Sequence, residues 1–214
     1  MNKLMMVVGA VALVGSMAGC MSAKEKIAAE YERLTTMPPP ERVVCGCDKA
    51  IDDLAGAVCD ARFLAQKNLT AYANASANHR EYVGFMNDVA VLVKENGMTE
   101  EDAVKQVMSE IQSADTNLGA EEKVWPRVAE GIVAVQALKP EVLLKEFAIA
   151  TLRNADLIAS ASKLSGSFSG FDATTIAKAR AAASVAEQAA ETAECLAFLT
   201  EQYRRVLVAA NYNK

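Results

Sequence analysis

The stretch DATTIAKARAAASVAEQAAETAECLAFLTEQYRRVLVAA, residues 172–210, decides the fold of this chain. It is rich in alanine, the best helix former, and as one helix it would extend about 58 Å. Two packing partners are indicated, because its small and apolar residues form two stripes at heptad spacing: Ile176, Ala179, Ala183, Ala186, Ala190, Ala193 and Ala197, and beside them Val185, Ala189, Leu196, Leu199, Tyr203 and Val206. We therefore expect this helix to lie inside a bundle, with the small residues letting one partner approach closely.

The amino-terminal third of the chain shows the same helical periodicity. Residues 22–25, Ser-Ala-Lys-Glu, form a capping box that starts a short helix. Pro38 to Pro40 end that helix, and Pro40 suits the first position of the next one. A heptad stripe predicts that this next helix reaches about Tyr72, along Val44, Cys47, Ile51, Leu54, Val58, Ala61 and Ala65. The polar residues 74–79 are expected to turn the chain.

Four further segments carry apolar residues at helical spacing, at residues 82–93, 99–111, 124–135 and 140–157. Gly97 ends the first and Thr99 caps the second. Pro126 either kinks the third or lies in its first turn, and Pro140 opens the fourth. With no alternating strand pattern in the sequence, we predict an all-α fold. It would be a multi-helix bundle of about six helices with left-handed heptad-type packing, in a single domain over residues 40–214.

The first 20 residues, MNKLMMVVGAVALVGSMAGC, have the layout of a secretory signal. Lys3 precedes a short apolar run, and small residues follow. Residues 17–20, Met-Ala-Gly-Cys, resemble the lipobox of bacterial lipoproteins. The resemblance implies cleavage after residue 19, acylation of Cys20, and anchoring in the cell envelope facing the periplasm, with residues 20–39 as the lipidated tether. Met21 after the acylated cysteine favours the outer membrane.

Two other readings of the amino terminus stay open. Residues 16–18, Ser-Met-Ala, also suit cleavage before Gly19 by the ordinary signal peptidase. An uncleaved transmembrane anchor is the other reading, but residues 1–19 reach only about 28 Å as a helix. A comfortable span needs about 20 apolar residues, so this reading is disfavoured.

Four cysteines remain in the exported chain, where disulfides usually persist. If Cys45, Cys47 and Cys59 share one helix, Cys59 lies about 21 and 18 Å along the axis from the other two, too far for a bond. Cys59 and Cys195 each fall near the middle of a long helix. We therefore predict a Cys59–Cys195 disulfide.

Cys45 and Cys47 are separated only by Gly46. On an unbroken helix their side chains point about 200° apart, so they cannot bond each other. If Gly46 breaks the helix, a strained and easily reduced Cys45–Cys47 bond becomes possible, with a redox role. A zinc or copper site at the two thiols is another reading, although the usual paired Cys-x2-Cys spacing is absent.

No catalytic constellation or cofactor motif emerges from the remaining residues. His79, the one histidine, lies in a polar stretch and is expected to be a solvated loop residue. Asp48 and Asp52 are spaced to share a helix face next to Asp53, but nothing indicates the pocket that acid–base catalysis needs. The net charge of −5 and the mixed surface argue against nucleic acid as a partner.

The carboxyl terminus, Asn-Tyr-Asn-Lys at residues 211–214, follows an alanine-rich heptad helix. It resembles the Braun-type outer-membrane lipoprotein, whose helix ends in Tyr-x-Lys with the lysine joined to peptidoglycan. Only Tyr212 and Lys214 carry this resemblance, and this chain is longer and multi-helical. The resemblance implies possible attachment of Lys214 to the cell wall.

Taken together, these features predict a lipid-anchored envelope protein that acts as a structural or interaction module without catalysis. Its partner would be another envelope protein that binds an exposed apolar stripe. Two other functions stay open. One is a small-molecule or metal binder with a pocket between helices, and the other is a thiol enzyme using Cys45 and Cys47.

Overall fold

The computed structural model describes residues 22–42 and 44–212, and within these ranges it contains seven α-helices and no strand. The predicted all-α fold is confirmed. The helices are α1 (Ala23–Thr35), α2 (Lys49–Ser76), α3 (Arg80–Asn96), α4 (Glu100–Asp115), α5 (Trp125–Gln136), α6 (Pro140–Ser167) and α7 (Ala173–Tyr212). None of the helices in the described residues combines the length and the hydropathy of a membrane span.

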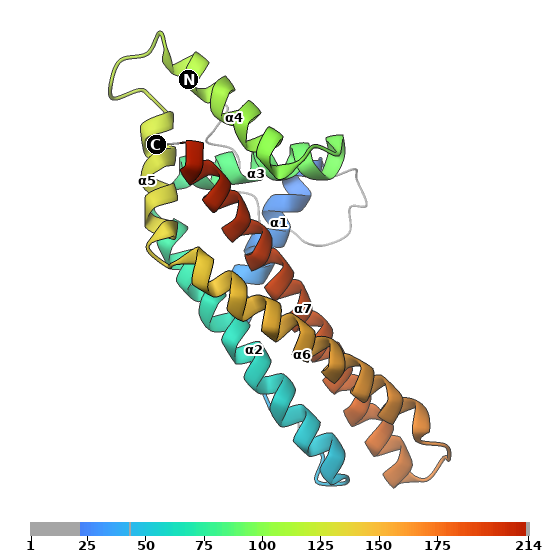
Figure 1. Ribbon diagram of the computed structural model, residues 1–214. Coiled ribbons are helices and arrows are strands. Elements are labelled where there is room, and N and C mark those ends of the chain that lie inside the picture. The colour runs from blue at the N-terminus through green and yellow to red at the C-terminus, as the bar shows by residue number, and fades with distance from the viewer. Residues whose placement is uncertain (1–21, 43, 213–214) are drawn as a thin grey trace.

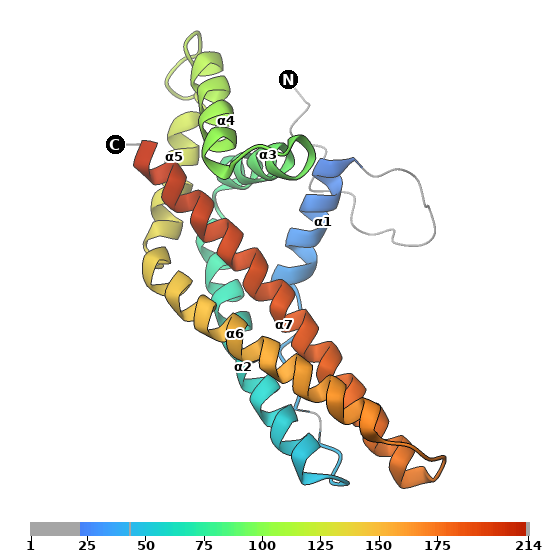
Figure 2. The same cartoon turned by 45° about the vertical axis from the view of Figure 1, so that its right-hand side comes forward.

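Three long helices form a rod at one end of the molecule (Figure 1). α2 and α7 run in the same direction and pack on each other, and α6 runs in the opposite sense and packs against both. α6 and α7 form an antiparallel hairpin, closed by residues 168–172. At the other end, α4 and α5 pack against the carboxyl-terminal half of α7, and α3 packs against α4 and α5 (Figure 2).

α1 buries Leu34 in the core of this second end, and three ion pairs are spaced along its length. Lys24 Nζ lies 2.5 Å from Asp88 Oδ1, and Lys94 Nζ lies 3.0 Å from Glu30 Oε2, which joins α1 to α3. Arg33 at the end of α1 pairs with Glu194 of α7 at 2.7 Å.

Local capping explains most of the helix boundaries. The predicted capping box is present, since Ser22 Oγ accepts the N–H of Glu25 and Glu25 accepts the N–H of Ser22. Thr99 caps α4, and Gly97 ends α3 in a left-handed conformation with φ of 65°. Pro126 lies in the first turn of α5, and Pro140 opens α6.

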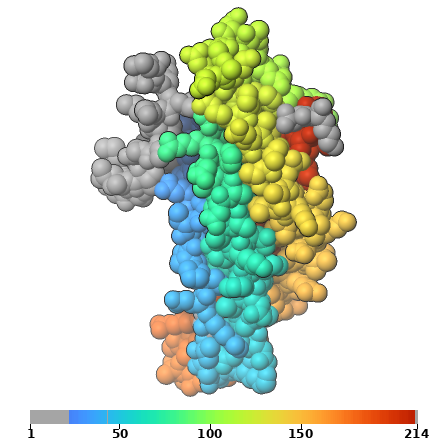
Figure 3. Space-filling view, turned by 90° about the vertical axis from the view of Figure 1, so that its left-hand side faces the viewer, coloured from blue at the N-terminus to red at the C-terminus, as the bar shows by residue number. Residues whose placement is uncertain are grey.

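The predicted helix over residues 44–48 is wrong. α2 begins at Lys49, because Asp48 accepts the N–H of Ala50 as an N-cap and Gly46 has a left-handed φ of 60°. Residues 36–42 and 44–48, which we call the strap, are not helical and run along α2. In Figure 3, the segment that contains the strap (blue) lies on the opposite side of α2 from α6 (gold). α2 also continues through Ser76, into the stretch expected to turn the chain.

Two apolar cores follow one another along the molecule. The smaller core fills the rod and is rich in alanine: Ile51, Ala55, Val58, Ala161, Ala181, Ala182, Val185 and Ala189. The larger core lies at the other end and holds most of the aromatic residues, among them Tyr72, Tyr82, Phe85, Phe147 and Tyr203. Buried polar side chains occupy the level between them, on all three long helices.

α7 buries only one of its two predicted stripes. The stripe that includes Val185, Leu196 and Tyr203 is buried along its whole length. In the alanine stripe, by contrast, Ala183, Ala190 and Ala197 are exposed. Another close helix contact forms where α3 crosses α5. There Gly131 lies against Tyr82 and His79, so closely that an added Cβ would clash with both side chains.

Candidate functional site

The Cys45–Cys47 pair forms a disulfide-closed loop directly before α2. The two Cα atoms are 5.1 Å apart, and both side chains are partly buried. Gly46 breaks the helix, which is the condition under which the sequence allowed this bond. The Asp52 carboxylate accepts the N–H of Cys45 at 2.8 Å and of Gly46 at 3.1 Å. Asp52 therefore fixes the loop to the first turn of α2.

Acidic side chains surround this loop. Asp48 pairs with Lys178 of α7 at 3.2 Å, and the Lys178 ammonium, with the N–H groups of the first turn, lowers the pKa of Asp48. Asp53 pairs with Lys49. Asp48 and Asp52 therefore have a structural role, because they hold the start of α2 together. While the two sulfurs are bonded to each other, neither is a thiolate that could bind a metal, so the redox and metal readings of Cys45 and Cys47 stay predictions.

The predicted Cys59–Cys195 disulfide is wrong, since both cysteines are free. The register of α2 against α7 is the cause. Arg62 pairs with Glu191, 129 residues on, and Tyr72 donates to Gln202, 130 residues on. Cys59 is therefore level with Gln188, about two helical turns from Cys195, or about 10 Å along the axis. Cys195 instead lies 4.0 Å from the Met37 sulfur, and burial raises the pKa of its thiol.

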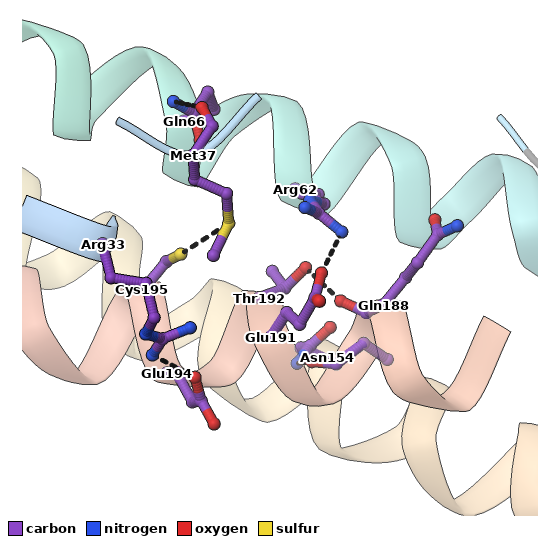
Figure 4. A network of polar contacts seen from close by, with 11 residues as sticks. Arg33, Met37, Arg62, Gln66, Asn154, Gln188, Glu191, Thr192, Glu194 and Cys195 are labelled. Atoms are coloured by element: carbon purple, nitrogen blue, oxygen red, sulfur yellow. Dashed lines mark hydrogen bonds and ion pairs between the residues drawn. The ribbon is translucent and has the colours of Figure 1, made fainter. Parts of the chain in front are cut away.

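A buried polar layer sets this register (Figure 4). Arg62, almost fully buried, reaches from α2 to Glu191 of α7. Asn154 of α6 is 1% exposed, and its Nδ2 donates to the carbonyl oxygen of Ala189 at 2.7 Å. Gln66 Nε2 donates to the carbonyl oxygen of Met37 at 2.9 Å, which ties the strap to α2. Since an unpaired buried polar group is costly, this layer fixes how the three helices slide and rotate.

The rotation of α6 matters because it exposes an apolar row. With Asn154, Phe147 and Ala150 turned inward, the opposite side of the helix faces solvent. Ile149 is 53% exposed and Leu152 is 72% exposed. We call this surface the outer face of α6; it consists of Val142, Lys145, Glu146, Ile149, Leu152, Arg153 and Asp156, all exposed.

The four charges of this face have no partner in the described part of the chain. Lys145, Glu146, Arg153 and Asp156 form no ion pair there, whereas both buried arginines do. The outer face of α6 was not recognised in the sequence. Its signal was the spacing of Val142, Lys145, Ile149, Leu152 and Asp156 by three and four residues, which lies opposite the inward-facing set of the same helix.

Two open hollows lie elsewhere on the surface. One, of about 400 Å³, is lined by Arg42, Asp53, Gly56, Ala57, Cys59 and Asp60, and the other, of about 310 Å³, by Gln112, Asp115, Thr116, Lys123, Trp125 and Pro126. Neither is the apolar pocket between helices that a ligand-binding function calls for. The described residues contain no cluster of three or more metal-ligating side chains.

The remaining candidate residues fall as follows. His79 is partly buried at the start of α3 and packs beside Gly131, so it is not the solvated residue expected. Tyr212 donates a hydrogen bond to Glu101 of α4, and Lys105 lies 4.9 Å from its ring centre. Cys20 and Lys214 lie outside the described residues, so lipidation and wall attachment stay predictions.

Comparison with known protein families, curated proteins and solved structures finds no match for this chain.

Proposed function

We propose that this protein is a lipid-anchored, periplasm-facing envelope protein that works as a non-catalytic interaction module. Its binding surface is the outer face of α6, and the exposed apolar row on that face is the observation that carries the proposal. Large exposed apolar side chains at helical spacing on a charged background are typical of helix-recognition surfaces. Ile149 and Leu152 lie at the centre of the row.

The anchoring half of the proposal rests on Cys20. The cysteine at the end of the lipobox-like segment is separated by one residue from Ser22, the N-cap of α1, so the sequence leaves almost no linker between lipid and bundle. Several acyl chains on one cysteine hold a protein stably on a membrane. The outer face of α6 would then bind its partner close to the membrane surface.

Two experiments test the two halves separately. Radiolabelled palmitate should enter the wild-type protein in its native host and not the Cys20→Ala variant; equal labelling of both rejects the anchor. A photo-cross-linking amino acid at Leu152 should give a discrete adduct in intact cells. The same group at Ala190, exposed on α7, is the matched control. Identical patterns at the two positions reject the outer face of α6 as a binding surface.

A further inference from the structure

We infer that the outer face of α6 binds the same face of a second copy of this chain, with the two helices antiparallel. The inference rests on the proposed function, because it names the occupant of the surface assigned there. Its basis is that the pattern of this face is self-complementary under a two-fold rotation.

The apolar centre of the face defines where the two-fold axis passes. Val142, Lys145, Ile149, Leu152 and Asp156 are spaced by three and four residues, which is the seam of a two-helix contact. If the axis passes midway between Ile149 and Leu152, each Ile149 meets Leu152 of the other copy. Both are exposed in one copy and become covered in the pair.

The charges fit the same axis. The rotation that joins Ile149 to Leu152 also places Lys145 opposite Asp156 of the second copy, on both sides of the apolar centre. Glu146 and Arg153 lie on one flank of the seam, and the same rotation brings Glu146 to within about 3 Å along the axis of Arg153 of the second copy. Four ion pairs thus form from side chains that have no ion-pair partner within the described residues of one copy.

A parallel arrangement of the two α6 helices would not pair opposite charges. In register, it would place Lys145 against Lys145 and Asp156 against Asp156, and like charges across an interface are unfavourable. The flanking positions also favour close approach, because Ala148 and Ala155 are exposed beside the seam and carry only a methyl group. The face carries two acidic and two basic residues, so it has no net attraction for an anionic lipid surface.

The expected affinity is modest. One helix face is near the lower limit of about 1,000 Å² for a specific interface, so we expect micromolar dissociation. Such an affinity is sufficient for molecules concentrated at a membrane surface.

Charge exchange between positions 146 and 153 tests the inference on full-length protein in detergent, by native mass spectrometry and sedimentation velocity up to about 100 µM. Glu146→Arg alone and Arg153→Glu alone should each weaken the homodimer by about tenfold or more, because each brings like charges together at both ends of the seam. An equimolar mixture of these two variants should restore dimerisation as a heterodimer, and the double variant should restore it as a homodimer. Both side chains are exposed, and circular dichroism of each variant checks that the fold is kept.

Four results would count against the inference. A wild-type dimer that neither single variant weakens refutes the antiparallel pairing, as does a mixture that fails to recover. A monomeric wild type whose Leu152 cross-linker captures a different protein rejects the second copy but keeps the proposed function. A monomeric wild type with no specific adduct at Leu152 rejects both.

Discussion

Gly131→Ala should destabilise the protein, although alanine is the better helix former. Gly131 is buried in the middle of α5, where α3 crosses it. An added Cβ would lie 2.6 Å from Tyr82 Cγ and 2.9 Å from His79 Cβ, and closer still to Tyr82 Cβ. Relaxed carbon–carbon contacts are about 3.5–4.0 Å. Because the Cβ atoms of Tyr82 and His79 move only with the α3 backbone, α3 and α5 must separate.

The size of the effect follows from two opposed contributions. Replacing glycine by alanine inside a helix gains about 1 kcal/mol. Overpacking a rigid contact costs about 1–3 kcal/mol, occasionally more, and the loss of contact between α3 and α5 adds to this. We expect a net loss of about 2 kcal/mol in the free energy of unfolding. In a chain of this size each kcal/mol is about 2–4 °C, so the melting temperature should fall by about 4–8 °C.

Gly84→Ala is the matched control, since Gly84 lies inside α3 with no foreign atom within 4 Å of its added Cβ. This variant should gain up to about 1 kcal/mol. Urea unfolding followed by circular dichroism measures both variants under the same conditions. If Gly131→Ala is as stable as Gly84→Ala, the close crossing of α3 and α5 is refuted.

Three further predictions concern buried groups. Tyr203→Phe should leave stability unchanged or raise it by up to about 1 kcal/mol, because its hydroxyl has no hydrogen-bond partner among the described residues, whereas Tyr72→Phe should cost about 1 kcal/mol in urea unfolding. Burial raises the pKa of Tyr203 to about 12, so stability should fall as pH rises above 10, and less steeply in Tyr203→Phe. Asp115→Asn should lower the free energy of unfolding at pH 7, and in acid the variant should be as stable as the wild type. Burial acts to raise the pKa of Asp115, but the N–H groups at the start of α5 lower it overall, so its contribution disappears as pH falls below the ordinary carboxyl value. Iodoacetamide at pH 8 should label Cys59 well before the buried Cys195, as peptide mass spectrometry can show; equal rates would contradict the burial of Cys195.

The fold could be predicted largely from local signals. The long carboxyl-terminal helix, the capping box at Ser22 and the stop at Gly97 depend on a few neighbouring residues, and all are present. The start of α2 also depends on neighbouring residues, but the heptad periodicity of the sequence hid it. Heptad spacing continued back to Val44, but the side chains of Asp48 and Asp52 bond the backbone and hold it out of the helix.

The cysteine pairing and the α6 face depend on contacts distant in sequence. Cys59 and Cys195 are suitably placed on their own helices, yet the Arg62–Glu191 pair sets them at different levels. The alanine stripe of α7 was expected to be buried because small residues permit close packing, and nothing in the stripe itself says which side faces a partner. Likewise, the row at Ile149 is visible in the sequence, but only the inward anchoring of Asn154 shows that it is exposed.

The ion pairs along α1 give the amino terminus a mechanical property. Tension applied at Ser22 loads the Lys24–Asp88 pair first, then the Glu30–Lys94 pair and then the Arg33–Glu194 pair. α1 would therefore detach turn by turn rather than in one step. Exposed ion pairs contribute little individually, so the first turns of α1 yield at low force. The load then reaches Tyr31, which packs against Tyr72 and Phe198, and Leu34, which is buried in the larger core. Residues 22–30 can extend to about 30 Å before these contacts are loaded. A protein held by Cys20 would thus have a short extensible segment next to its anchor, and stronger tension would pull directly on the core.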